Sequence, residues 1–316
     1  MKLRIGTRKS PLALWQANHI KDKIQKLNPD IKIEIIEISS DGDQNLVQPL
    51  YGFGITGVFT KSLDTALVND KIDLAVHSLK DIPTSLANGL ELSSVLARDY
   101  NQDMLVFRND YPLDSLDWSK VTIATGSLRR RAFLANKYPK VRFKDIRGNV
   151  QTRLKKMREI KADATVLSKA GLKRMNLITN SMDVDFMFPS VGQGCIAVVS
   201  SESCDNRVKL VLEKLGCKTT EKITSLERHF LKTMEGGCSA PIGIRIKATT
   251  HNHFKVNAAL LSLDGKDRLD VTDFGFTLSD DCLEKGKELA HRILAKGGDE
   301  MMVKIKKEIA KTVGKK

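Results

Sequence analysis

Leu3-Arg-Ile-Gly-Thr-Arg-Lys-Ser-Pro11 begins the chain with the pattern of a strand that runs directly into a helix. Leu3-Arg-Ile predicts a short apolar strand, Ser10 offers a capping hydroxyl, and Pro11 suits a first helical position. Apolar residues then recur at helical spacing and mark one buried face: Ala13, Ala17, Ile20, Ile24 and Leu27. A second strand follows over residues 31–38. This order favours a parallel sheet with helices on both faces.

The same alternation continues outward from this unit and then repeats. A helix is expected from Phe59 to Leu67, and the apolar run 74–76 predicts a buried strand. A second α/β unit follows, with a helix beginning near Ser127. Its expected strands cover residues 104–107, 121–124, 141–146 and 164–167. A late strand near 195–200 can return to the first sheet.

The last hundred residues have a different pattern. They predict one helix, three strands joined in part by the hairpin turn Asp264-Gly265, and a further long helix near 282–296. The strands are expected over 242–247, 254–261 and 269–276. This part therefore predicts an α+β domain with an antiparallel sheet.

Length and composition exclude several classes of protein. The 316 residues correspond to two or three domains at about 100–200 residues each, and 41% hydrophobic residues can form real cores. The longest apolar runs, such as 195–199, are far shorter than the roughly 20 residues of a membrane-spanning helix. The chain enters a strand almost at once, without the pattern of a signal peptide, so we expect a cytoplasmic protein. The net charge of +14 favours anionic ligands.

Cysteine usage argues against a structural metal or a disulfide framework. The five cysteines are odd in number and never spaced as C-x-x-C. We therefore expect free thiols and no metal site. Nucleotide cofactors are not indicated, because Gly192-Gln-Gly194 is too short for a dinucleotide fingerprint and no phosphate-binding loop motif occurs.

Basic residues gather where expected strands end and helices begin. Such clusters occur at 7–10, 125–131 and 147–153. In open α/β sheets these junctions form the ligand crevice, where helix N-termini and arginines suit anions. A single arginine there is equally consistent with a solvated surface charge. Three clusters at equivalent junctions favour a cleft that binds anions.

Two further segments carry candidate chemistry. Lys80-Asp81 follows a buried strand, so its carboxylate can stabilise a cation or accept a ligand N–H; a local ion pair or a helix cap is the alternative. His77 fits a packed histidine better than a base, since no triad partners are visible. Cys238 follows Gly236-Gly237 on a turn and is either a nucleophile or attachment point, or a buried inert thiol.

Together these segments resemble the porphobilinogen deaminase family through nearly the whole chain. The stretches that carry the resemblance are Arg4–Gln16, Ala75–Pro83, Gly126–Arg130, Arg147–Arg153, Ala170–Arg174, Val191–Gly194 and Leu231–Gly243. The resemblance implies two periplasmic-binding-protein-like α/β domains plus a smaller α+β C-terminal domain with a three-stranded antiparallel sheet. It also implies a monomeric transferase, a hydroxymethylbilane synthase that joins four porphobilinogen molecules head to tail and releases ammonia, in tetrapyrrole (haem) biosynthesis.

The resemblance further implies roles for individual residues. Cys238 matches the family's attachment point for a covalent dipyrromethane primer, held by a thioether. Asp81 matches the catalytic aspartate, which stabilises the cationic azafulvene formed as the amine leaves. The positions that match binders of substrate and cofactor carboxylates are Arg8, Ser10, Lys80, Thr125, Ser127, Arg129, Arg130, Arg147, Arg153 and Arg174. Each pyrrole unit carries an acetate and a propionate, which agrees with the basic clusters.

Two positions depart from the family pattern. Thr56 stands where the family's loop over the site usually has a lysine, and Gly126 replaces a serine, which removes one hydroxyl donor. Neither change affects Asp81 or Cys238, so the expected activity stands.

The expected domains follow from the order of the segments. Domain 1 covers residues 1–97 and 194–217, domain 2 covers 101–190, and domain 3 covers 218–316. The crossings near 97–101 and 190–194 then form a hinge. A non-catalytic two-lobed anion-binding protein is the main alternative, but it has no use for Cys238. Nucleic-acid binding is disfavoured, because only 5% of residues are aromatic and no recognition motif occurs. No membrane partner is expected.

Overall fold

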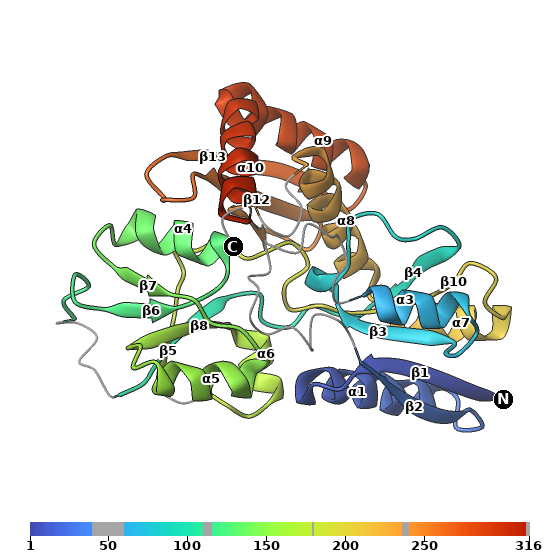
Figure 1. The fold of residues 1–316 in the computed structure, drawn as a ribbon. Helices are drawn as coiled ribbons and strands as arrows, with labels where there is room; N and C mark the ends of the chain where they lie inside the picture. Colours follow the sequence, from blue (N-terminus) through green and yellow to red (C-terminus); the bar gives the residue numbers. More distant parts are fainter. Residues whose placement is uncertain (40–59, 110–115, 179, 236–239, 314–316) are drawn as a thin grey trace.

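The computed structural model describes residues 1–39, 60–109, 116–178, 180–235 and 240–313, which form three sheets with their helices (Figure 1). Two sheets have five strands each and belong to α/β units, and the third has three antiparallel strands. The expected fold class is confirmed. No helix within these ranges is both long and apolar enough to cross a membrane.

The first sheet is mixed rather than fully parallel. In spatial order its strands are β2 (Lys32–Ile38), β1 (Lys2–Arg8), β3 (Leu74–Ser78), β10 (Ile196–Ser201) and β4 (Leu90–Val95). β1 runs parallel to β2 and β3, while β10 is antiparallel to both of its neighbours. β10 is the late strand near residues 195–200 that was predicted to return to this sheet, and that prediction is confirmed. Its neighbours β3 and β4 both precede it by about a hundred residues, so the sheet closes only through a long-range pairing.

Helices cover both faces of the first sheet. They are α1 (Pro11–Leu27), α3 (Lys61–Val68) and α7 (Asn206–Leu215), with the single turn η2 (Leu79–Asp81) after β3. α1 begins as expected, because the backbone N–H of Ala13 donates to Ser10 Oγ at 3.4 Å. Leu27 was expected on the buried face of α1 but is 47% exposed, since it is the last residue of the helix.

The second sheet repeats the topology of the first. Its spatial order is β7 (Arg142–Lys144), β6 (Thr122–Ala124), β8 (Ala164–Ser168), β5 (Asp103–Phe107) and β9 (Ser181–Asp183). β6 is parallel to β7 and β8, and β5 is the antiparallel strand in the place that β10 holds in the first sheet. The helices are α4 (Leu128–Lys137), α5 (Val150–Glu159) and α6 (Lys169–Arg174).

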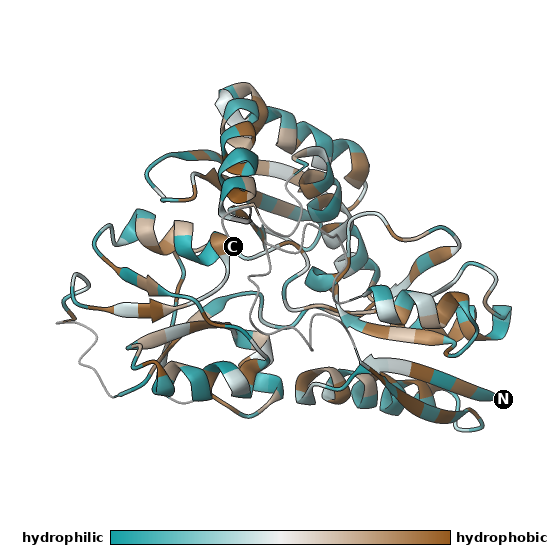
Figure 2. Ribbon diagram, in the orientation of Figure 1, coloured by the Kyte–Doolittle hydropathy of each residue, from teal (hydrophilic) through white to brown (hydrophobic). Residues whose placement is uncertain are grey.

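The third sheet consists of β11 (Ile242–Ala248), β12 (His253–Leu261) and β13 (Arg268–Thr277). Its helices are α8 (Lys218–Thr233), α9 (Cys282–Ile293) and α10 (Asp299–Val313), with the π-turn η4 (Leu294–Gly298) between the last two. The side chains of Phe230 and Leu289 are fully buried between these helices and the sheet. Hydrophobic and hydrophilic colours alternate along the strands and helices (Figure 2), which is the pattern expected of elements packed in layers.

Two crossover segments join the α/β units, over residues 96–102 and 184–195. β12 packs on the second unit, where Leu261 shares a core with Phe133 of α4. α8 reaches the first unit, because Arg228 donates to the carbonyl of Pro83 at 2.6 Å. The third unit therefore contacts both α/β units.

Candidate functional site

A small cavity lies at the carboxyl ends of β1 and β3, where the first basic cluster was expected to form a site. Its volume is about 60 Å³, and it is lined by Arg8, Ser10, Leu12, Ala13, Gln16, Val76, His77, Ser78 and Asp81. Three of the sequence-predicted site residues, Arg8, Ser10 and Asp81, therefore meet here. The cavity has cationic and hydroxyl donors together with one carboxylate.

Gln16 and Ser78 complete this wall and were not expected from the sequence. Gln16 is 2% exposed, and its Nε2 donates to Ser78 Oγ at 2.9 Å. A signal was available, because Gln16 lies on the face of α1 that otherwise presents Ala13, Ala17 and Ile20 to the core. A buried amide on an apolar helix face requires a polar partner.

His77 lies beside Arg8 in the first sheet. β1 and β3 are neighbouring strands, with Ile5 paired to Leu74 and Gly6 to Ala75, and Arg8 and His77 each lie two residues after the second pair. His77 is 5% exposed, and its ring Nε2 has no hydrogen-bond partner in the described part of the chain. Burial, together with the Arg8 charge, lowers the pKa of His77 to about 4. The imidazole is therefore neutral at neutral pH.

The second sheet contributes the other basic clusters from the ends of β6 and β7. Ser127 caps α4 by accepting from the Arg130 N–H at 3.4 Å, and Thr125 Oγ1 accepts from the Ser127 N–H at 3.3 Å. Arg147 is 8% exposed, and burial lowers the pKa of its guanidinium. Arg153 lies in the first turn of α5, and its Nε donates to the Gly148 carbonyl at 2.7 Å.

Arg153 shows that the two sheets face a common charged region. Burial and the neighbouring Arg130 lower the pKa of Arg153 to about 10. Asp81 opposes that shift, and Arg8 adds to it, although both belong to the first sheet. The carboxylate of Asp81 is thus within electrostatic reach of cations from both α/β units.

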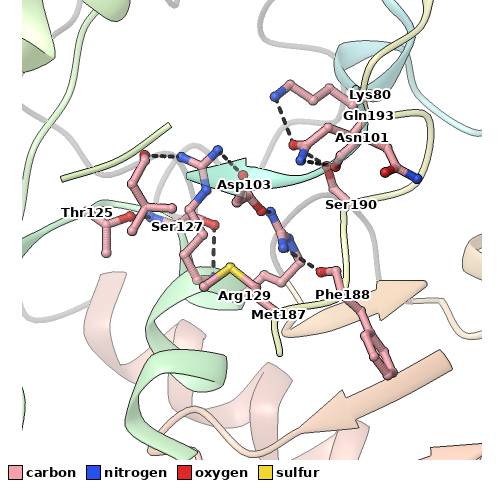
Figure 3. A network of polar contacts seen from close by, with 12 residues as sticks. Lys80, Asn101, Asp103, Thr125, Ser127, Arg129, Met187, Phe188, Ser190 and Gln193 are labelled. Carbon is pink, nitrogen blue, oxygen red and sulfur yellow. Dashed lines mark hydrogen bonds and ion pairs between the residues drawn. The ribbon is translucent and has the colours of Figure 1, made fainter. Parts of the chain in front are cut away.

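Arg129 and Arg130 do not stand free in a cleft, because they share one buried carboxylate. Arg129 Nη2 lies 2.7 Å from Asp103 Oδ2, and Arg130 Nη2 lies 2.8 Å from Asp103 Oδ1 (Figure 3). Their Nη1 atoms donate to the carbonyls of Phe188 and Val166, each at 2.6 Å. Burial alone would raise the pKa of Asp103, but the two guanidinium groups hold it well below its usual range. The cluster keeps one net positive charge.

Lys80 faces the second crossover rather than a carboxylate. Its Nζ donates to Gln193 Oε1 at 3.2 Å, and Gln193 Nε2 donates to the Asn101 carbonyl at 2.7 Å (Figure 3). Burial and the charge of Arg130 lower the pKa of Lys80 to about 8. Gln193, fully buried, thus connects a lysine of the first unit to both crossovers.

Arg174 stands apart from this set. Arg174 ends α6, pairs with Asp99 at 2.8 Å and donates to the Gly194 carbonyl at 2.7 Å, which places it at the crossovers. Cys238 and Thr56 lie outside the described residues. α8, the helix that precedes Cys238, is held next to Asp81, since Arg228 binds the carbonyls of Ile82 and Pro83.

Comparison with known proteins gives one consistent result. Residues 3–209 match the family model "Porphobilinogen deaminase, dipyromethane cofactor binding domain", and residues 222–295 match "Porphobilinogen deaminase, C-terminal domain". The porphobilinogen deaminase of Chlorobium phaeobacteroides is 37% identical over 97% of this chain and 98% of its own. That of Desulfosudis oleivorans is 38% identical over 98% and 99%.

Solved structures also match this chain. The VFT2 domain of Bordetella pertussis BvgS superposes on 68% of this chain and 86% of its own, with a TM-score of 0.43 and 14% identity. That superposition is loose, and the assignment to a family rests on the sequence relatives.

Proposed function

This chain belongs to the porphobilinogen deaminase family, and from that premise we propose which of its residues perform the family's chemistry. The reaction joins four porphobilinogen molecules into 1-hydroxymethylbilane with release of ammonia, in tetrapyrrole biosynthesis. The family's cofactor is a dipyrromethane.

The cavity residues fit such a group by the chemistry of their donors. Pyrrole acetates and propionates require cations and hydroxyls, which Arg8 and Ser10 supply from the cavity wall and Arg153 supplies from α5 of the second unit. Pyrrole N–H groups require an acceptor, and Asp81 is the carboxylate that lines the cavity. When bound, the dipyrromethane supplies the pyrrole to which the first substrate molecule is joined. Cys238 is its proposed point of attachment.

Asp81 is the proposed catalytic residue. As the protonated amine leaves the substrate, positive charge develops on the pyrrole and its methylene carbon. A carboxylate held beside the ring stabilises the transition state, in which the charge lies on the pyrrole, more than the ground state, in which it lies on the ammonium group, and this difference lowers the barrier. The observation that carries this assignment is the position of Asp81 in the cavity, within electrostatic reach of Lys80 and Arg153.

The basic residues are proposed to hold carboxylates in two ways. Arg8, Ser10 and Lys80 act from the first sheet, and Thr125, Ser127, Arg147 and Arg153 act from the second. Arg129, Arg130 and Arg174 already bind carboxylates of the chain itself, Asp103 and Asp99. We assign them a contribution through the positive field, together with the buried Nε of Arg130, which has no partner among the described residues.

We also propose that the chain works as a cytoplasmic monomer, without nucleic acid, and that its domains have the boundaries 1–97 with 194–217, 101–190 and 218–316. Support for the boundaries comes from the three sheets and the two crossovers between them. Light scattering at several protein concentrations tests the monomer, and a mass that rises with concentration contradicts it.

Intact-mass measurement tests the cofactor assignment. The purified protein should exceed its sequence mass by two condensed pyrrole units, and the Cys238→Ser variant should not. A bare wild-type mass that stays unchanged after incubation with porphobilinogen would overturn the assignment. A surplus retained in Cys238→Ser would keep the cofactor but move its attachment to another residue.

A further inference from the structure

His77 is a buried polar residue whose ring Nε2 has no hydrogen-bond partner in the part of the chain that the structure describes. It is 5% exposed, and its Nε2 is sealed from solvent with no hydrogen bond to any residue in the described ranges. Buried polar atoms in proteins are nearly always paired, and leaving one unpaired destabilises the folded state. An apolar residue of similar size would pack in this place without that penalty. The unpaired ring therefore points to a partner that arrives with the ligand.

The surroundings of His77 identify where that partner sits. His77 lines the cavity that also presents Arg8, Ser10 and Asp81. Arg8 lines the same cavity from the neighbouring strand β1, and its charge acts on the His77 imidazole. A ligand atom bound by Arg8 is therefore within reach of the imidazole.

The chemistry of this pair selects the ligand group. Arginine is only a donor, so the group between Arg8 and His77 must accept hydrogen bonds and carry negative charge. The same guanidinium repels a ligand N–H or ammonium, which belongs near Asp81. Next to Arg8 the imidazole stays neutral, and a neutral imidazole still offers one N–H donor.

We propose that His77 is a ligand-binding residue, which donates a ring N–H to the pyrrole carboxylate that Arg8 holds. This inference rests on the proposed function, because it takes the cavity to receive a pyrrole unit. It adds an imidazole donor to a site that the sequence describes by its cations and hydroxyls. A neutral donor contributes hydrogen bonding and direction without further charge repulsion among Arg8, Arg153 and Arg130.

The test compares His77→Leu with two polar variants. The probe is the methylpyrrole that carries the acetate and propionate of porphobilinogen but no amine, so that it binds without reacting. Its Kd for the holoenzyme is measured by calorimetry. His77→Leu should weaken binding by about 10- to 100-fold, the range for a hydrogen bond to a charged group. His77→Gln or His77→Asn, whichever places its amide N–H at the same point, should bind within a few-fold of wild type.

Stability and a matched control separate this role from packing. His77→Leu should not lower Tm, because it replaces an unpaired polar group with an apolar one. His229→Leu is the control, since His229 Nδ1 contacts the Ser225 carbonyl at 2.9 Å on α8, outside the cavity. It should leave the Kd unchanged. Unchanged binding by His77→Leu would overturn the inference.

Monoesters of the probe identify the carboxylate and cover a variant that fails to fold. For wild type, one monomethyl ester should bind far more weakly than the other. In His77→Leu, the same ester should reduce the affinity by a smaller factor than it does in wild type. If His77→Leu does not fold, His77→Gln and His77→Asn are compared instead. The proposal is contradicted if each monoester weakens binding to both variants by the same factor as in wild type. Failure of the wild type to make hydroxymethylbilane would instead contradict the proposed function.

Discussion

Arg98 and Glu227 form a buried two-pronged ion pair that joins the third unit to both crossovers. Arg98 Nη1 and Nη2 donate to the two Glu227 oxygens at 2.8 and 2.9 Å. Glu227 is fully buried, and its Oε2 also accepts from the Gly192 N–H at 2.8 Å. Arg98 lies in the first crossover and Gly192 in the second, so one carboxylate on α8 fixes the relative position of the two segments on which any hinge motion depends.

Glu227→Gln should lower the free energy of unfolding by about 3–5 kcal/mol, because it leaves the Arg98 charge buried and unpaired. Urea denaturation measures the change. Glu34→Gln is the control, since its pair with Lys2 at 2.7 Å is exposed and should leave the midpoint unchanged. Equal midpoints for both variants would mean that the buried pair contributes nothing.

Gly243→Ala should destabilise the contact between the third unit and the second. A Cβ at Gly243 would lie 2.7 Å from both Cβ and O of Phe188, closer than real contacts. Overpacking of this kind costs about 1–3 kcal/mol. Gly275→Ala on β13 is the matched control, because a Cβ there has no atom within 4 Å. Thermal unfolding should show a lower Tm for the first variant only.

Asp81→Asn should lower kcat by about 100- to 1000-fold, the range for removing one preorganised electrostatic group. Tm and the Kd of the unreactive methylpyrrole should change little, because asparagine keeps an oxygen that accepts the pyrrole N–H and lacks only the charge that stabilises the reacting pyrrole. Asp22→Asn, on the exposed face of α1, serves as the control. A higher KM with an unchanged kcat would make Asp81 a binding residue only.

Raising the pH should weaken substrate capture through Lys80. Burial and the charge of Arg130 lower the pKa of Lys80 to about 8, so its positive charge disappears as the pH rises through that value. We expect kcat/KM to fall between about pH 7 and about pH 10, since that ratio reports groups of the free enzyme. Lys80→Arg keeps its charge and should flatten the profile. An identical fall in Lys80→Arg would assign the titration to another group.

Lowering the pH should destabilise the fold through His77. Its pKa is about 4 when folded and about 6.5 when unfolded, so between these values the unfolded chain binds more protons. Stability is therefore lost as the pH falls through this window, by up to about 3 kcal/mol. His77→Leu should lack this loss. Parallel pH dependences for the two proteins would contradict the folded pKa.

Much of the fold was predictable because, in each α/β unit, the sequence marks the point where a strand ends and a helix begins with a capping residue. Ser10 and Ser127 are caps in the structure, and the late strand of residues 195–200 joins the first sheet as β10. β4 and β9 were missed, since a short half-buried edge strand has a weak apolar pattern. α10 was missed as well, although Met302 and Ile305 are buried at helical spacing.

The sequence predicted which residues form the candidate site better than it predicted their hydrogen-bond and ion-pair partners. Residues at neighbouring strand ends share an edge, which is why Arg8, Ser10 and Asp81 meet in one cavity. The partners of Arg129 and Arg130 were not predictable. Asp103 lies on β5, an antiparallel strand from an earlier part of the chain, and no local pattern indicates that it reaches α4.

The position of β10 has a consequence for how the chain is made. β4 pairs only with β10 among the described strands, so a ribosome must add about a hundred residues after β4 before its edge is covered. Until then β3 and β4 present unpaired backbone, the kind of surface that promotes aggregation. Pairings this distant in sequence also form slowly. The first unit should therefore mature after the second, and nascent chains that stop before residue 196 should depend on chaperones.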